Sequence, residues 1–206
     1  MAGPFIAAGT LRWRAIWIYM GVIASGSLLQ RLYVKRHNPR LLERKQSVGS
    51  GTARWDILWT LFAGPLVSLP PILAGYGVRV GWPQLAVGWL LLGVVANSVG
   101  GLIWARSMAA NPHFESTVRI QRELGHVVVE HGPYRFVRHP GYLGFCIGSL
   151  GAPLMLQSWP AFAVGSLLPI AFVVRTALED RLLQRELPGY AAYARRVRYR
   201  LLPRVW

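Results

Sequence analysis

The stretch GPYRFVRHPGY, at residues 132–142, leads directly into an apolar run at residues 142–157. It contains two arginines, one histidine and two tyrosines. Polar side chains this dense at the mouth of a membrane segment are costly unless they bind something. The stretch therefore predicts an embedded helix with a polar binding site at its end.

The composition predicts that the chain lies in a membrane. Of its 206 residues 53% are hydrophobic and 15% are charged, whereas soluble domains carry roughly 25% charged residues. Nine tryptophans and eight tyrosines also suit the headgroup level of a bilayer. We expect one polytopic membrane domain over residues 1–206, without a cleavable signal peptide.

Apolar runs predict an all-α integral membrane protein with about five transmembrane helices. The last two runs are short for a bilayer, which needs about 20 helical residues, so we expect a helical hairpin that crosses the membrane or is re-entrant. Prolines predict a kink in the second run, and glycines in the third predict close helix approach. The runs are residues 15–34, 57–78, 82–104, 142–157 and 161–174; the prolines are Pro65, Pro70 and Pro71; the glycines are Gly88, Gly93, Gly100 and Gly101.

The basic residues predict the orientation of the chain. They gather between the first and second runs, between the third and fourth, and after the fifth, whereas the second connection has only Arg79. Positive charge concentrates on the cytoplasmic side. This predicts the N-terminus outside and the C-terminus and polar stretch inside, although Arg12 and Arg14 then lie on the outer side. The first basic segment carries Lys35, Arg36, Arg40, Arg44, Lys45 and Arg54.

Several functions are disfavoured by what the chain lacks. The net charge of +15 lies in connections between apolar runs rather than in a basic domain, which favours anionic lipid over nucleic acid as the partner. There is no G-x-G-x-x-G motif or P-loop. The three histidines near the polar stretch lack the spacing of metal ligands, and the single Cys146 excludes an internal disulfide.

Candidate binding residues precede and fill the polar stretch. Three valines after His126 predict a short extended segment whose backbone could bind a ligand, although a β-like loop without a ligand fits equally. Pro140 suits the first position of a helix whose free N–H groups attract a carboxylate. The alternative is that Arg138 reaches lipid headgroups and His139 caps the helix. The candidates are Gln121, His126, Val127, Val128, Val129, Tyr134, Arg138, His139, Pro140, Gly141 and Tyr142.

A second candidate group follows the fifth run. Arg175 and Glu179 are four residues apart and share a helix face, and Asp180 follows them. They form either a simple intrahelical ion pair or a set that holds polar ligand groups at the membrane mouth. The basic tail after residue 186 is expected to contact lipid and to close the site without a chemical role, with Trp206 as an interface anchor.

Together these motifs resemble the isoprenylcysteine carboxyl methyltransferase family and the related phospholipid N-methyltransferases. The resemblance covers the chain from roughly Trp104 to the end. Two departures are fewer spans than in the eukaryotic enzymes and Asp180 in place of a continued glutamate run. The matching motifs are Gly132-x-Tyr134, Arg138-His139-Pro140-x-Tyr142 and Arg175-Thr176-x-x-Glu179, with Asn38-Pro39 and the run from Pro188 to Tyr193 as further features.

The resemblance implies that S-adenosylmethionine binds at the cytoplasmic face, between the loop before the fourth span and the C-terminal helix. Residues 1–104 would supply three spans and residues 105–206 the cofactor-binding and catalytic half. Glu179 would join the eleven candidates above in the cofactor pocket. Arg175 would bind the substrate, and Arg175, Glu179 and His139 would be the catalytic residues, with no metal.

The expected acceptor is a lipophilic small molecule, a lipid or a prenylated substrate. A carboxylate acceptor needs a cation to orient it, a role that suits Arg175, whereas an amine or thiol needs His139 or Glu179 as a base. Two other functions stay open: an NADPH-dependent reductase of the sterol type, and a non-catalytic transporter or lipid-binding membrane protein.

Overall fold

A computed structural model of the chain describes residues 2–43 and 51–206. Within these ranges the regular elements are helical and there is no strand, which confirms the all-α prediction. Arg44 and Lys45, two of the basic residues used to predict the orientation, lie outside the described residues. The α-helices are α1 (Gly3–Ala8), α2 (Arg14–His37), α3 (Pro39–Glu43), α4 (Arg54–Arg79), α5 (Val87–Ala110), α6 (Pro140–Met155), α7 (Trp159–Gly165), α8 (Leu167–Glu186) and α9 (Tyr190–Arg196), with 3-10 turns η1 (Arg122–Leu124) and η2 (Gly132–Arg135).

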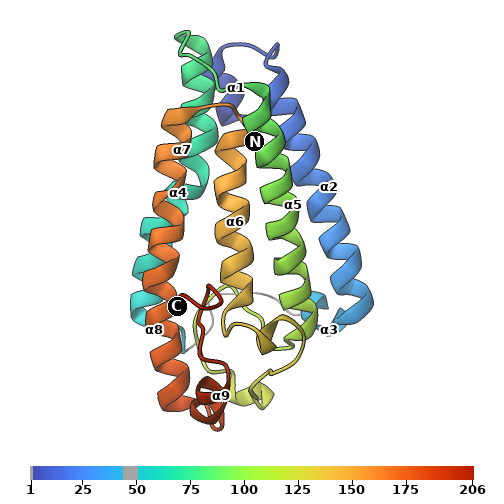
Figure 1. Cartoon of the computed structure of the whole chain (residues 1–206), viewed down its shortest axis with the longest axis vertical. Helices are drawn as coiled ribbons and strands as arrows, with labels where there is room; N and C mark the ends of the chain where they lie inside the picture. Colours follow the sequence, from blue (N-terminus) through green and yellow to red (C-terminus); the bar gives the residue numbers. More distant parts are fainter. Residues whose placement is uncertain (1, 44–50) are drawn as a thin grey trace.

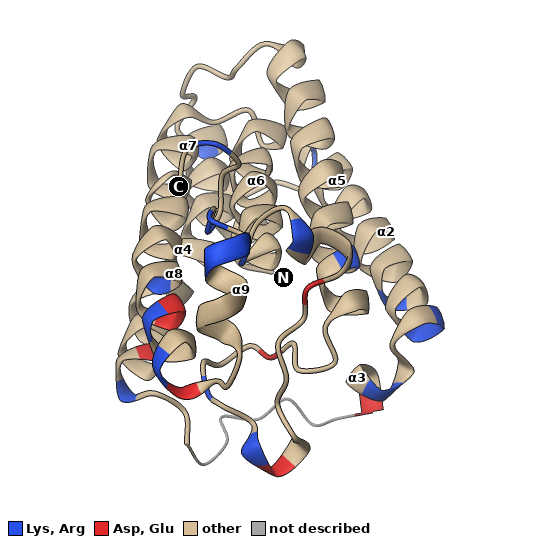
Figure 2. Ribbon diagram, turned by 60° about the horizontal axis from the view of Figure 1, so that its bottom comes forward, with Lys and Arg blue, Asp and Glu red and all other residues tan. Residues whose placement is uncertain are grey.

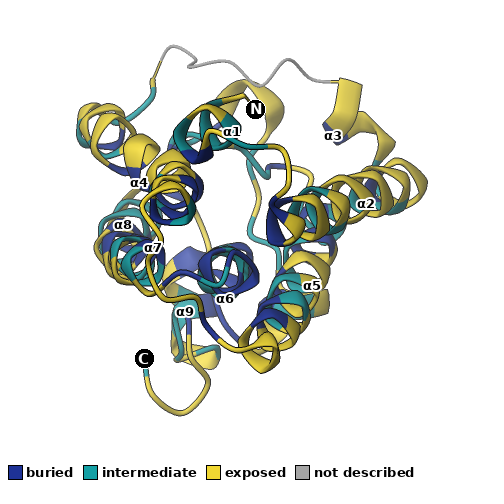
Figure 3. Cartoon of the chain, turned by 90° about the horizontal axis from the view of Figure 1, so that it is seen from above, coloured by how far each residue is buried: buried dark blue, intermediate teal, exposed yellow. Residues whose placement is uncertain are grey.

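The long helices stand side by side and form a bundle (Figure 1). Viewed along its axis, α2, α5, α6, α7 and α4 follow one another around the bundle (Figure 3). The apolar residues of α2, α4 and α5 face outward; Leu61 is 69% exposed and Leu91 is 60% exposed. Large apolar side chains exposed over entire helices mark a surface that faces lipid.

Four helical segments are long and apolar enough to cross a membrane. They are α2, α4, α5 and the combined segment Trp159–Glu186, which comprises α7 and α8. The predicted fifth run, residues 161–174, thus extends at both ends, to Trp159 and to Glu186. At the second end the polar residues after Val174 continue the helix. The fourth run forms α6, whose 16 residues span about 24 Å and fall short of the roughly 30 Å of bilayer hydrocarbon. α6 and α7 form the expected hairpin (Figure 1).

Glycines bring α5 and α6 into backbone contact. A Cβ atom added to Gly100 would lie 2.4 Å from the carbonyl oxygen of Gly144, and one added to Gly93 would lie 2.6 Å from that of Gly151. Gly88 and Gly101 meet no atom within 4 Å, so the predicted close approach involves only two of the four glycines. α4 continues through its three prolines as one helix.

The polar residues gather at one end of the bundle. The loop of residues 111–139, the end of α8 and α9 lie together there, and the charged residues concentrate in the same region (Figure 2). The N-terminus and α1 lie at the opposite end (Figure 1). The long loop and the C-terminal tail, distant in sequence, therefore meet at the start of α6.

Candidate functional site

A cleft opens at the polar end of the bundle, between the loop of residues 111–139, the start of α6, the end of α8 and α9. It holds about 800 Å³ of space between the side chains, part of which is open to solvent. Of the twelve residues predicted for the cofactor, Pro140 is absent from its walls and is buried at the first position of α6. The others line it: Gln121, His126, Val127, Val128, Val129, Tyr134, Arg138, His139, Gly141, Tyr142 and Glu179.

Half of the cleft wall was not found by the sequence analysis. Tyr190 and Tyr193 belong to the run from Pro188 to Tyr193, for which the sequence predicts no chemical role. The residues of the 111–119 loop carry no motif, and they reach the cleft only because the loop folds back over the start of α6. The additional lining residues are Asn111, His113, Phe114, Glu115, Thr117, Val118, Arg119, Leu183, Leu187, Tyr190 and Tyr193.

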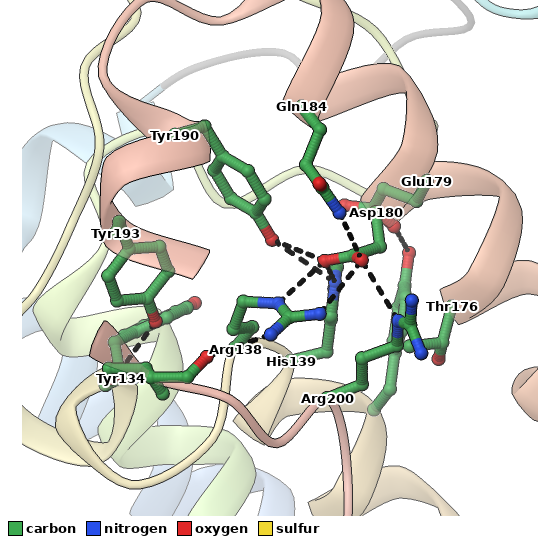
Figure 4. Close-up of polar contacts among 12 residues, drawn as sticks. Tyr134, Arg138, His139, Thr176, Glu179, Asp180, Gln184, Tyr190, Tyr193 and Arg200 are labelled. Atoms are coloured by element: carbon green, nitrogen blue, oxygen red, sulfur yellow. Dashed lines mark hydrogen bonds and ion pairs between the residues drawn. The ribbon is translucent and has the colours of Figure 1, made fainter. Parts of the chain in front are cut away.

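Beside the cleft, Arg138 is bound in a buried ion pair (Figure 4). Its Nε donates to Asp180 Oδ1 at 2.7 Å and its Nη2 to Asp180 Oδ2 at 2.9 Å. Its Nη1 donates to the carbonyl oxygens of Val197 and Arg198 at 2.8 and 2.9 Å. Such a bidentate pair satisfies both planar groups. Arg138 therefore holds the loop, α8 and the C-terminal tail together.

Asp180 is the centre of this polar network and is fully buried. Besides Arg138, it accepts from Gln184 Nε2 at 2.8 Å, Arg200 Nε at 2.9 Å and the Tyr190 hydroxyl at 3.0 Å (Figure 4). His139 Nε2 lies 3.5 Å from Asp180 Oδ1. One carboxylate thus gathers residues from the loop before α6, from α8, α9 and the tail, which explains why a buried charge is tolerated here.

The backbone of the tail supports the same loop. The Arg138 and His139 amides donate to the carbonyl oxygens of Tyr199 and Arg200, each at 2.9 Å. The tail thus contacts the polar stretch directly, in addition to any contact with lipid.

His139, Tyr142 and Glu179 meet at the start of α6. The Tyr142 hydroxyl donates a short hydrogen bond to Glu179 Oε2. The His139 and Tyr142 rings are nearly parallel, with centroids 5.7 Å apart. A carboxylate, a phenol and an imidazole therefore share one side of the cleft.

Arg175 occupies a neighbouring site outside the cleft wall. Its Nε lies 2.9 Å from Asp56 Oδ1, and its Nη2 donates to Asp56 Oδ2 at 3.1 Å and to the Ser116 carbonyl at 2.6 Å. Its guanidinium also lies 4.4 Å from the Trp59 ring and 5.2 Å from the Tyr142 ring. The ion pair of Arg175 is thus made with Asp56 on α4.

Burial changes the protonation of groups in the cleft loop. The pKa of His126 is lowered to about 4, first by burial and then by the nearby His113 and Arg119. The rings of His126 and His113 stack at 4.5 Å. Burial likewise raises the pKa of the Tyr134 and Tyr193 hydroxyls. At neutral pH these groups are therefore uncharged. Among the described residues no group of three His, Cys, Asp or Glu side chains could hold a metal ion.

A second, apolar space lies inside the bundle; we call it the chamber. It encloses about 1,060 Å³, partly open, and residues from α2, α4, α5, α6 and the α7–α8 segment line it. Gly141 and Tyr142 line the cleft, and Gly144 and Phe145 line the chamber. Three residues correspond to about 5 Å along a helix, so the two spaces are about one turn of α6 apart.

Aromatic rings form the wall between the cleft and the chamber. Phe114, on the cleft side, packs edge-on against Trp104, on the chamber side, with centroids 5.1 Å apart. Phe145 contacts Trp104 at 5.7 Å and Phe172 at 4.6 Å, and Phe172 also contacts Tyr142 at 5.0 Å. We refer to these five rings as the aromatic wall.

The fold and the site define a polytopic α-helical membrane protein with a polar cleft at one end of its bundle. Residues 91–185 match the model of the isoprenylcysteine carboxyl methyltransferase (ICMT) family. Over these residues the chain is similar to this family.

Named relatives include members of the same kind. A probable protein-S-isoprenylcysteine O-methyltransferase of Oryza sativa subsp. indica is 30% identical over 121 residues, which cover 56% of this chain and 63% of the relative. Protein-S-isoprenylcysteine O-methyltransferase A of Arabidopsis thaliana is 38% identical over 89 residues, 40% of this chain and 45% of the relative. The cobalt-zinc-cadmium resistance protein CzcN of Cupriavidus metallidurans is 31% identical over 152 residues, 71% and 52% of the two chains. The alignments thus span between 45% and 63% of these relatives.

Proposed function

We propose that this protein is a membrane methyltransferase that uses S-adenosylmethionine in the cleft and methylates a lipophilic acceptor held in the chamber. The match to the family model and the names of the relatives support this function. The observation that carries the proposal is the arrangement of the two spaces. A polar cleft and an apolar chamber lie about one helical turn apart and meet at the aromatic wall.

The chemical character of the cleft fits the proposed methyl donor. S-adenosylmethionine supplies an electrophilic methyl group on a positively charged sulfonium. The Glu179 carboxylate and the Tyr142 ring present negative charge and a π-face, both of which attract a cation. The N-terminus of α6, at Gly141 and Tyr142, favours an anionic group such as the donor's carboxylate. Apolar side chains of Val127, Leu183 and other residues offer packing for a flat base.

The chamber supports the second half of the proposal. Its walls are mostly apolar and come from helices that face lipid on their other side. An amphipathic acceptor could therefore place its tail there and its reacting group beside the aromatic wall. A carboxylate on an apolar tail fits this arrangement, in keeping with the description of the matching family as carboxyl methyltransferases.

The proposed reaction requires mainly positioning. The acceptor oxygen forms a bond to the methyl carbon while the carbon–sulfur bond breaks and its electron pair stays on sulfur. A carboxylate acceptor releases no proton, so the chain needs to orient the acceptor and exclude water. The Arg175 guanidinium lies 5.2 Å from the centre of the Tyr142 ring, and we assign it to orienting the acceptor, with Asp56 holding the guanidinium in place. If the acceptor is an amine or thiol, His139 or Glu179 takes its proton.

The same proposal places the cleft on the cytoplasmic side of the membrane. The basic segments described by the structure cluster at the cleft end of the bundle (Figure 2). Positive charge at the ends of spans favours the cytoplasmic face, where a soluble donor can enter the cleft.

Thermal unfolding of the purified protein with different ligands tests the donor. We expect S-adenosylmethionine and S-adenosylhomocysteine to raise the unfolding midpoint, because a ligand bound only to the folded state stabilises it by mass action. NADPH should have no effect. A shift with NADPH alone would instead favour a reductase, and no shift with any of them would favour a non-catalytic protein.

The acceptor itself is found with a labelled methyl donor. Membranes from cells with and without the intact gene are incubated with methyl-labelled S-adenosylmethionine, and the labelled lipids and small molecules are compared. We expect a labelled lipophilic product that is lost with the gene. Label restricted to water-soluble products would contradict the chamber as the acceptor site.

A further inference from the structure

Two side-chain amides interrupt the apolar lining of the chamber. Asn97 lies near the middle of α5, and Gln30 lies in the half of α2 that leads toward the cleft. Both line the chamber, and both also line an adjoining hollow of about 1,020 Å³ between α2 and α5. They are therefore accessible to a molecule in the chamber.

Neither amide uses its full hydrogen-bonding capacity within residues 2–43 and 51–206. Asn97 Nδ2 donates to the Gly148 carbonyl at 3.3 Å, and Gln30 Nε2 approaches the Met108 sulfur at 3.3 Å. An amide offers two N–H groups and an oxygen with two lone pairs, and a thioether is a weak acceptor. Polar groups at this depth in a membrane protein are expensive and point to a functional partner.

The two amides also lie at a definite distance from the proposed reaction site. Gly141 lines the cleft, and Gly148, which binds Asn97, is seven residues further along α6. Seven residues of helix correspond to about 10 Å. Gln30 contacts Met108, close to the cleft end of α5, and thus lies between Asn97 and the cleft along the bundle.

We infer that the chamber selects an acceptor whose apolar tail carries a hydroxyl, carbonyl or amide group about 10 Å or less from its reacting end. Asn97 and Gln30 bind that group. This inference rests on the proposed function, because it takes the chamber as the acceptor site. A plain hydrocarbon or prenyl tail would leave both amides facing methylene groups, and a site built to hydrogen-bond a substrate discriminates against the analogue without the polar group.

Competitive binding without any methyl donor tests the inference. Purified protein is loaded with cis-parinaric acid, whose fluorescence is excited by energy transfer from tryptophan; Trp104 lines the chamber. Stearic acid and a series of hydroxystearic acids substituted at successive mid-chain carbons then displace the probe. The measured quantity is the preference, defined as the ratio of the stearic acid and hydroxystearic acid dissociation constants.

We expect Asn97→Leu and Gln30→Leu each to lower the preference for the best hydroxystearic acid by about fivefold, the effect of one hydrogen bond. Partition of the fatty acids into detergent is the same for wild type and variants and cancels in the comparison. Ser149→Ala is the matched control, since its hydroxyl lines the chamber but already donates to the Cys146 carbonyl at 2.9 Å. It should leave the preference unchanged.

An unchanged preference in the Asn97→Leu/Gln30→Leu double variant would overturn the inference. Gln30→Leu keeps it testable if Asn97→Leu does not fold, because Gln30 contributes only a weak bond to sulfur. The assay contains no S-adenosylmethionine, so its outcome is independent of the thermal shift that tests the donor. If parinaric acid binds but S-adenosylmethionine does not shift the unfolding midpoint, the chamber is supported as a binding site and the proposed methyltransferase activity is contradicted.

Discussion

Single residues at the polar end of the bundle divide into those that face the cleft and those that hold it together. Arg138 and His139 are neighbours in sequence, yet the arginine donates hydrogen bonds to Asp180 and to the tail, whereas the histidine ring stacks on Tyr142. The sequence marked both as ligand-binding residues. An arginine binds an anionic ligand and a buried carboxylate equally well. The sequence therefore could not predict that Arg138 binds Asp180, because it does not tell how close α8 lies to the loop before α6.

Asp180→Asn is expected to destabilise the protein by about 3 kcal/mol or more. It removes the negative charge that binds the guanidinium groups of Arg138 and Arg200 and the Tyr190 hydroxyl. The free energy of unfolding, measured by denaturant titration of the purified protein, checks this. Glu186→Gln is the control, since its partner Arg122 is 74% exposed and exposed pairs contribute little. Equal stability of the two variants would show that Asp180 does not hold the site together.

The unfolding midpoint should fall as the pH drops from about 6.5 to about 4. His126 has a pKa lowered from 6.5 to about 4 in the folded protein, so over this interval the unfolded chain binds the extra proton and acid favours unfolding. The stabilisation is complete above the unfolded pKa and is lost as the pH falls toward the folded one. Melting curves at about pH 7 and about pH 5 measure it.

His126→Gln, which cannot be protonated, is the control for the pH effect. Its midpoint should depend less on pH over this interval than that of the wild type. Glu123 faces His126 and partly opposes the shift, whereas His113 and Arg119 add to it. An identical pH dependence in the variant would assign the effect to another group.

Arg175→Ala should lower turnover strongly while leaving S-adenosylmethionine affinity nearly unchanged, because Arg175 lies outside the cleft wall. It should also destabilise the fold, since Asp56 loses its buried partner. Adding Asp56→Asn removes that unpaired charge. If turnover stays low in the double variant while stability recovers, Arg175 acts on the acceptor; recovery of both would make Arg175 purely structural.

At the scale of helices, hydrophobic runs predicted where the elements lie, and contacts determined where they end. The fifth run extends to Glu186 because its polar last turns pack against the cleft loop and the tail, as the bonds of Arg175 and Asp180 show. The valines of residues 127–129 form no strand, since no neighbouring strand pairs with them in the described part of the chain. α6 stays short because both of its ends meet structure rather than lipid: the tail at one end and the 156–158 turn at the other.

Gly100→Ala should destabilise the protein by about 2 kcal/mol, because its Cβ would lie 2.4 Å from the Gly144 carbonyl oxygen and must push α5 and α6 apart. Gly101→Ala is the matched control: its Cβ meets no atom within 4 Å, and alanine favours a helix by up to about 1 kcal/mol. Thermal unfolding of the two variants compares them. Similar midpoints would mean that α5 and α6 are not in backbone contact.

For the molecule as a whole, the placement of charge predicts one orientation in the membrane. The N-terminal end carries little charge, and the cleft end carries most of it (Figure 2). The charge pattern in the sequence already predicted that the polar stretch and the tail share one side. It predicted that the tail closes the site but not which bonds the tail makes with the polar stretch, because these require the hairpin of α6 and α7–α8 to return the tail to the start of α6.

Labelling with a membrane-impermeant maleimide tests the orientation in intact cells. Cys146 is first replaced by serine, and single cysteines are then introduced as Leu11→Cys and Val205→Cys, at positions 67% and 75% exposed. Under the positive-inside rule the first should react and the second should react only after the cells are opened. The opposite pattern would place the cleft outside and contradict access from the cytoplasm.

The sequence by itself determined the helical membrane class, the number of apolar runs, the common side of the polar segments and half of the residues that line the cleft. These follow from local properties, namely the length and hydrophobicity of each run and the charge beside it. Only the tertiary structure decided which arginine binds which carboxylate: Arg138 with Asp180, and Arg175 with Asp56. It also placed the chamber against the cleft. Both depend on how helices that are distant in sequence pack together, and the sequence around an arginine does not specify which carboxylate will bind it.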